Sequence, residues 1–138
     1  MGSIVEERIM GPGDAARVFR RCIQRGEVDG LLVLGLDGAR AVTGIALNPT
    51  HRALATVKVW ELVDLAAELD ACSLVLARFP RGGKRAPSVY EAHAFIDLAE
   101  RAARAHVLLL DCIVMRAHQW WSLAERARAA GTVADAAK

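Results

Sequence analysis

Short apolar runs alternate with amphipathic helical segments along this chain, and that alternation restricts the fold to the α/β class. Residues 31–36 and 72–77 are too short and apolar for surface helices and suit buried strands, and residues 106–115 form a third such run. Asp37-Gly38 is a tight-turn signal before a return strand at 41–47. Asn48-Pro49-Thr50 breaks the pattern, and a short strand is predicted at 54–57.

Segments with helical spacing lie between these strands. Asp14 is a good N-cap for an amphipathic helix that ends near Gly26, a second helix begins near Val59, and a long third helix opens at Ser88. Residues 120–130 combine apolar, polar and charged residues. The order α-β-β-(β)-α-β-α-β predicts a three-layer α-β-α fold, with helices on both faces of a mixed central sheet.

Length and charge limit the classes of protein to consider. The 138 residues suffice for one domain, and we expect a flexible segment at 1–11, the domain at 12–130 and a frayed tail at 131–138. A formal charge of only +2 gives no global field that would favour nucleic acid or membrane. No apolar run is long enough to span a bilayer, and the acidic start is unlike a signal peptide. We therefore expect a cytoplasmic protein without membrane contact.

The three cysteines are odd in number, and each lies in an apolar stretch. Cys22, Cys72 and Cys112 are therefore expected to be buried thiols in a reducing compartment, not a disulfide framework. None of the four histidines forms an i, i+4 pair or a metal-spaced cluster with a cysteine. A rebuilt metal site that uses Cys112 and His118 is the alternative to a buried thiol and a surface imidazole.

The segment from residue 74 to residue 91 is the most informative for function, because a strand leads through a Gly/Pro loop into a helix. Open α/β sheets place their sites at such loops. The strand ends in Ala77-Arg78-Phe79-Pro80, and Ser88-x-x-Glu91 follows after seven more residues. This arrangement resembles the motif of the JAB (MPN/JAMM) metal hydrolases, in which H-x-H-P precedes S-x-x-D.

Further elements resemble the RadC branch of that superfamily. They are Leu36-Asp37, Thr50, Pro87-Ser88, Leu109-Leu110-Asp111-Cys112 and Ser122-Leu123. The resemblance runs from about residue 12 to about residue 123 and implies a JAB/MPN fold, which has cytidine-deaminase-like architecture. It also implies a zinc ion held by two histidines and an aspartate, with a glutamate that activates the bound water.

The chain departs from the family pattern at the residues that would hold zinc. Ala77 and Phe79 occupy the two histidine positions, Glu91 replaces the aspartate, Asp29 falls near the position of the glutamate, and Cys112 replaces a histidine outside the ligand set. Catalytic zinc needs about three protein ligands and an open water position. We therefore expect no cofactor, and a catalytically inactive RadC-like domain that works as a binding module, either with a protein partner or as a homo-oligomer.

Two other functions stay open. The loop carries a basic cluster with Phe79 interleaved, formed by Arg78, Arg81, Lys84 and Arg85. This loop could grip the phosphates of a nucleic acid, which would suit the link of the RadC branch to DNA repair, or it could simply be solvated. The second alternative is a metal-dependent hydrolase with a relocated site that pairs Asp29 with Glu91.

Simpler structural roles compete with these functions. Ser88-x-x-Glu91 fits a capping box, in which the serine accepts from the glutamate amide and the glutamate reaches back. Trp120 and Trp121 are adjacent and cannot both face inward on a regular element, so one is expected to be exposed. An exposed indole suits an interface with a second copy or another protein, although packing under the tail would also serve.

Overall fold

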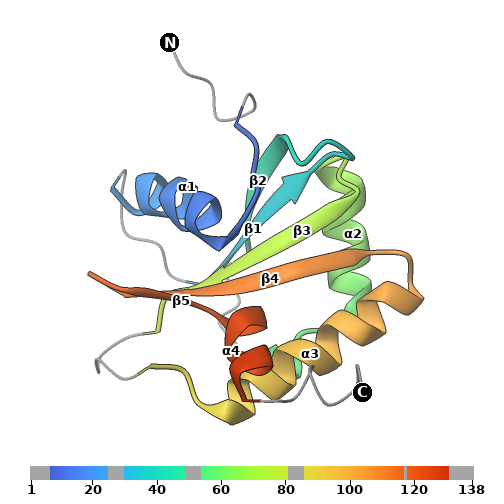
Figure 1. Ribbon diagram of the computed structural model, residues 1–138. Helices are drawn as coiled ribbons and strands as arrows, with labels where there is room; N and C mark the ends of the chain where they lie inside the picture. The colour runs from blue at the N-terminus through green and yellow to red at the C-terminus, as the bar shows by residue number, and fades with distance from the viewer. Residues whose placement is uncertain (1–6, 25–29, 49–53, 81–85, 117, 131–138) are drawn as a thin grey trace.

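The computed structural model describes residues 7–24, 30–48, 54–80, 86–116 and 118–130 (Figure 1). A single five-stranded sheet organises the chain. Its strands are β1 (Leu31–Leu36), β2 (Val42–Asn48), β3 (Ser73–Arg78), β4 (Leu108–Met115) and β5 (Trp120–Ser122). The helices are α1 (Pro12–Gln24), η2 (Leu54–Thr56), α2 (Val59–Glu68), α3 (Val89–Arg104) and α4 (Leu123–Ala129).

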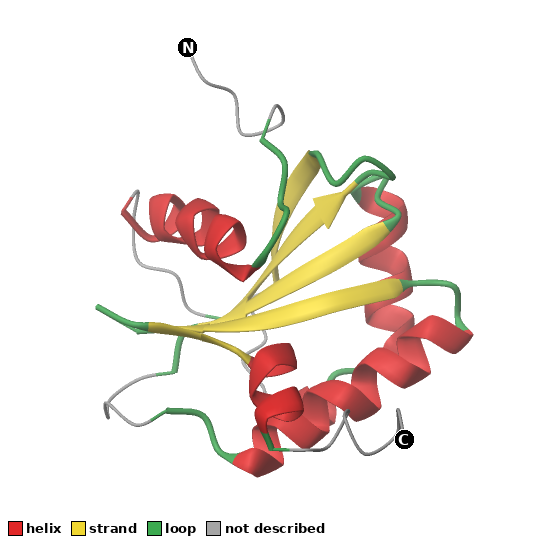
Figure 2. Cartoon of the chain, viewed as in Figure 1, coloured by secondary structure: helices red, strands yellow, loops and turns green. Residues whose placement is uncertain are grey.

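The sheet is mixed and has the strand order β2-β1-β3-β4-β5. β1 is antiparallel to both β2 and β3, β3 is parallel to β4, and β4 is antiparallel to β5. Figure 2 shows α1 on one side of the strands and α2 and α3 on the other. The predicted α/β class, with helices on both faces of a mixed sheet, is confirmed.

Each face of the sheet has its own apolar core, because successive strand side chains point to opposite faces. Leu74 and Leu76 of β3 pack with residues of α2 and α3. Val75 and Ala77 of the same strand pack with residues of α1. Side chains on opposite faces of β3 therefore belong to separate cores.

The predicted strand at 54–57 is wrong, because these residues form the 3₁₀ helix η2 and a turn. Leu54 and Val57 are both buried, at 2% and 4% exposure, whereas Ala55 and Thr56 between them are exposed. A spacing of three brings side chains to one side in a 3₁₀ helix, whereas a strand would place residues 54 and 57 on opposite faces. The amide of Val57 donates to the Leu54 carbonyl at 3.1 Å.

Only one of the three cysteines is fully buried, which corrects the expectation for the others. Cys112 is buried within β4, Cys22 is half-buried on α1, and Cys72 is exposed. Cys72 lies just before β3, where its amide donates to the Leu36 carbonyl at 2.8 Å. At that end of the strand the side chain lies outside both cores, although the strand that follows it is largely apolar. All three thiols are free.

None of the described helices is both long enough and apolar enough to cross a lipid bilayer.

Gly35 in β1 is expected to be intolerant of a side chain. A Cβ atom there would lie 2.8 Å from Thr43 Oγ1, 2.9 Å from Leu69 Cβ and 3.0 Å from Ala71 Cβ. Overpacking of this kind costs about 1 to 3 kcal/mol, so Gly35→Ala should lower the free energy of unfolding by that amount. Gly38→Ala is the matched control, because a Cβ there meets nothing within 4 Å. Urea denaturation of both variants checks the prediction, and equal losses would contradict it.

Candidate functional site

The two positions that hold histidines in the JAB motif are part of the apolar core beneath α1. Ala77 is completely buried, at 0% exposure, and Phe79 is half-buried against the same cluster. A methyl group and a phenyl ring have no lone pair for a metal ion. These side chains therefore act as packing groups.

Arg78 lies between them and points to the other face of β3, where it forms an ion pair with Glu91 at the start of α3. The Arg78 side chain is 14% exposed and that of Glu91 is 34% exposed. Of the three motif positions that hold zinc in the family, only Glu91 carries a side chain that could ligate a metal ion. Its carboxylate is instead bound by a guanidinium on the face opposite to Ala77 and Phe79.

The start of α3 forms only half of the predicted capping box. The Glu91 amide donates to Ser88 Oγ at 3.2 Å, so the serine caps the helix as predicted. The glutamate half is wrong, because the Glu91 carboxylate takes its hydrogen bond from Arg78. A charged guanidinium is a stronger donor than the backbone amide that a capping box would offer.

The residues present do not fit a catalytic zinc ion. Among the described residues, no group of three or more His, Cys, Asp or Glu side chains could hold a metal ion. Cys112 is fully buried, and burial raises the pKa of its thiol far above the ordinary value, with the Asp111 carboxylate adding to the rise. His118 is exposed, as predicted for a surface imidazole. Asp29 lies outside the described residues.

The buried carboxylate of Asp111 joins β4 to α4, and the sequence did not predict it as a site residue. Asp111 is 8% exposed. Its Oδ1 accepts from the amides of Cys112 at 2.7 Å and Ala124 at 3.0 Å, and its Oδ2 accepts from Ser122 Oγ at 2.5 Å. Burial raises the pKa of Asp111, and these three hydrogen bonds oppose the rise. The carboxylate therefore holds the first turn of α4 against the sheet.

An irregularity in the sheet explains the orientation of Asp111. The pairing of β3 with β4 shifts after Leu74, so that Leu74 pairs with Leu109 whereas Val75 pairs with Asp111. Such a bulge re-aims the side chains beside it. Strict alternation from Leu109, which packs on the α2 and α3 face, would put Asp111 on that face, whereas the shift places Asp111 opposite Val75 of the α1 face. Spacing alone contained no signal for this bulge.

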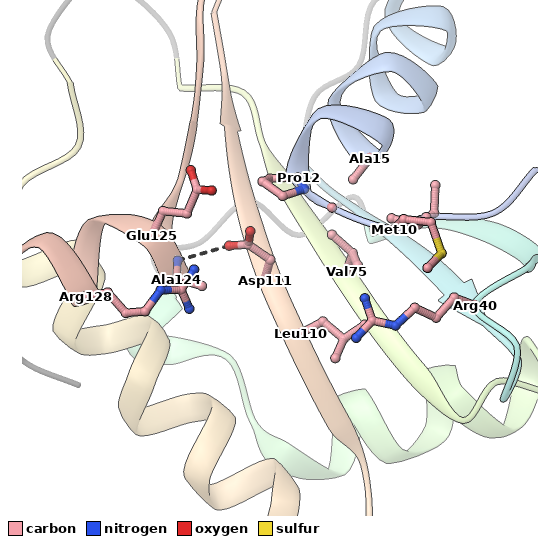
Figure 3. A pocket seen from close by; sticks show the side chains of 12 residues that line it. Met10, Pro12, Ala15, Arg40, Val75, Leu110, Asp111, Ala124, Glu125 and Arg128 are labelled. Carbon is pink, nitrogen blue, oxygen red and sulfur yellow. Dashed lines mark hydrogen bonds between the residues drawn. The ribbon is translucent and has the colours of Figure 1, made fainter. Parts of the chain in front are cut away.

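Asp111 also lines a pocket of about 260 Å³ between α1, the β1–β2 turn and α4 (Figure 3). The apolar lining includes Met10, Pro12, Val75 and Leu110, and the charged lining is Arg40, Asp111, Glu125 and Arg128. Arg40 follows the turn where Leu36 pairs with Val42, and Leu36 also pairs with the first residue of β3. The pocket thus extends toward the end of the sheet at which β3 begins, away from Arg78 and Phe79.

The basic loop lies largely outside the described residues, which hold none of Arg81, Lys84 and Arg85. The two residues between β3 and that loop, Phe79 and Pro80, are nevertheless described. Arg116 Nη1 donates to the Pro80 carbonyl at 3.5 Å, and Arg20 Nη1 of α1 donates to the Arg116 carbonyl at 2.9 Å. Two further arginines therefore stand where the loop begins. Sequence analysis missed them because they are 96 residues apart.

The tryptophan pair behaves as the sequence predicted. Trp120 is 37% exposed at the edge strand β5, and Trp121 is half-buried against the core on the α3 face. Two exposed aromatic residues were missed, namely Trp60 at 65% and Tyr90 at 85% exposure. The exposure of Trp60 could have been predicted from the sequence, because Leu62 and Ala66 define the buried face of α2 and Trp60 does not lie on that face.

A search of curated proteins found no match to this sequence. A family model described as the RadC-like JAB domain matches residues 9–128, which covers most of the chain. The mixed sheet with helices on both faces is consistent with that fold. The chain therefore belongs to the RadC-like JAB domain family.

Proposed function

We propose that this chain is a catalytically inactive RadC-like JAB domain that acts by binding, as a homo-oligomer or as a module for a protein partner in the cytoplasm. One observation carries the proposal. The two histidine positions, Ala77 and Phe79, lie in the apolar core, while Glu91 is engaged by Arg78 on the opposite face of β3. Glu91 of α3 thus lies on the face of the sheet opposite to Ala77 and Phe79, and side chains on opposite faces of a sheet do not converge on one metal ion.

The relocated hydrolase site is the weaker alternative. It requires Glu91 to act together with Asp29, but the Glu91 carboxylate already accepts from Arg78. This carboxylate is already engaged as a hydrogen-bond acceptor, which leaves it poorly placed to take a proton from water. Without a metal ion to lower the pKa of water, little would activate a nucleophile there.

Exposed indoles support the binding role. Aromatic side chains are enriched at interfaces, and Trp120 is partly exposed within β5, an edge strand of only three residues. Light scattering coupled to size exclusion, run over a concentration series, should show a dimer or larger assembly that Trp120→Thr dissociates. Tyr90→Thr is the control, because it removes an exposed ring from α3 and should leave the assembly intact. A monomer at every concentration would contradict homo-oligomerisation.

Nucleic-acid binding is a second candidate, favoured by the position of Arg20 and Arg116. They come from two separate segments and lie where the chain leads into residues 81–85, whose sequence holds three further basic residues. Phosphate contacts of this kind weaken steeply with salt. Fluorescence anisotropy with a DNA oligonucleotide at two salt concentrations measures this affinity. The triple variant Arg81/Lys84/Arg85→Ala should bind the DNA about tenfold or more weakly than the wild type. Arg104→Ala is the matched control, and equal binding by all three proteins would end this candidate.

A further inference from the structure

The pocket beside Asp111 combines an apolar floor with a charged rim. Val75 is 2% exposed and Leu110 is half-buried, and both belong to the core beneath α1. Met10, at 68% exposure, lines the same pocket and is one of the most exposed apolar side chains described. This floor offers apolar surface against which the apolar part of a ligand can pack.

Two arginines at the rim have no partner among the described residues. Arg40 and Arg128 are exposed, and their guanidinium groups make no hydrogen bond or ion pair with the described residues. Several other described arginines are paired, as in Arg17–Asp14, Arg21–Glu7 and Arg101–Asp97. Figure 3 draws Arg40 and Arg128 on opposite sides of the pocket, with Leu110 between them. Free guanidinium groups on two sides of a hollow are suited to a shared anion.

The backbone of Arg40 is fixed in a conformation that side chains rarely adopt. Its φ is 65°, in the left-handed region that favours glycine. Its amide donates to the Asp37 carbonyl at 2.9 Å, and its carbonyl accepts from the Ile9 amide at 2.9 Å. Strained residues of this kind are concentrated at ligand sites. A long cationic side chain is thus held at the rim of the pocket, at a position where glycine would cost less.

We propose that this pocket binds a small carboxylate with a short apolar body. The carboxylate lies at the rim between Arg40 and Arg128 and away from the Asp111 and Glu125 carboxylates, which would repel an anion. The apolar body covers Leu110 and Val75. A volume of about 260 Å³ is smaller than the sites of most drug-sized ligands, which limits the ligand to a short chain or a single ring.

This site is separate from the one on which the proposed function rests. It uses no residue of the Ala77 to Glu91 motif, and a catalytically inactive module could bind with or without it. Failure of the ligand proposal would leave the conclusions about zinc untouched. Conversely, discovery of zinc at the motif would leave the pocket proposal standing.

Titration of ¹⁵N-labelled protein with hexanoate and benzoate tests the proposal. Both should shift the amide resonances of Met10, Leu110 and Ala124, with a Kd on the order of 1 mM. The double variant Arg40→Gln/Arg128→Gln should bind about tenfold more weakly or worse, because two charge-assisted contacts are lost. Arg104→Gln removes another exposed arginine and should bind like the wild type.

Three results would overturn the proposal. Shifts confined to other surfaces would show that the pocket is not the site. Equal affinity in the double arginine variant would show that the rim does not hold the anion. Equal binding of hexanol and benzyl alcohol, which have the same apolar bodies without charge, would show that a carboxylate is not selected. Thermal unfolding of the double variant verifies that it remains folded.

Discussion

Asp111→Ala is expected to lower the free energy of unfolding by about 3 kcal/mol, because it leaves several polar groups without their acceptor. The amides of Cys112 and Ala124 and the hydroxyl of Ser122 all donate to this carboxylate. Denaturant unfolding of the purified variant measures the loss. Asp97→Ala is the matched control, because Asp97 forms an exposed ion pair with Arg101 on α3 and should contribute little. Equal losses in the two variants would contradict the role of Asp111.

Asp111→Asn separates the acceptor role from the charge. The amide oxygen can still accept from both backbone amides, and the amide nitrogen can donate to Ser122 Oγ. Because burial raises the pKa of Asp111 in the folded state, its protonated form stabilises the fold. That contribution is complete below the unfolded pKa, near 3.8, and is lost as pH rises through the higher folded value. Asp111→Asn should therefore gain stability relative to wild type between acid and neutral pH, whereas a constant difference would contradict this.

Ala77→His, which restores a motif histidine, is expected to destabilise the chain by about 3 kcal/mol rather than to help rebuild a metal site. Ala77 is completely buried in the core beneath α1, so an imidazole there is both too large and unpaired. Ala46→His is the control, because Ala46 is half-buried in the edge strand β2 and should cost much less. Urea denaturation compares the two variants.

The double variant Ala77→His/Phe79→His extends this prediction. One equivalent of zinc should not raise its melting temperature, because Glu91 lies on the other face of β3 in an ion pair with Arg78. A metal-dependent rise in melting temperature would mean that the three positions still converge, contrary to the structure. A loss of stability in Ala77→His no larger than in Ala46→His would likewise contradict the buried position of Ala77.

The sequence predicts the order of elements well, because each strand and helix has a distinct apolar period. The buried run at 31–36, the cap at Ser88 and the exposure of one indole of the tryptophan pair all follow from local rules and are confirmed. The error at 54–57 arises because four residues are too few to show a period in the sequence. The exposure of Cys72 depends on where β3 begins, which the pattern located one residue too early.

The site required information that the sequence does not hold locally. The absence of donors at Ala77 and Phe79 is visible from the resemblance alone, but the Arg78–Glu91 ion pair depends on how α3 packs beside β3. The orientation of Asp111 depends on a bulge. The pocket gathers Arg40 and Arg128, which are far apart in the chain. These features arise from tertiary structure, which periodicity does not encode.

Measurement of the zinc content of the purified protein, after expression in zinc-supplemented medium, tests the central claim most directly. If the motif can no longer form a metal site, elemental analysis should find no stoichiometric zinc, and Glu91→Ala should not change the result. About one zinc per chain, lost in Glu91→Ala, Cys112→Ser or His118→Ala, would contradict the account.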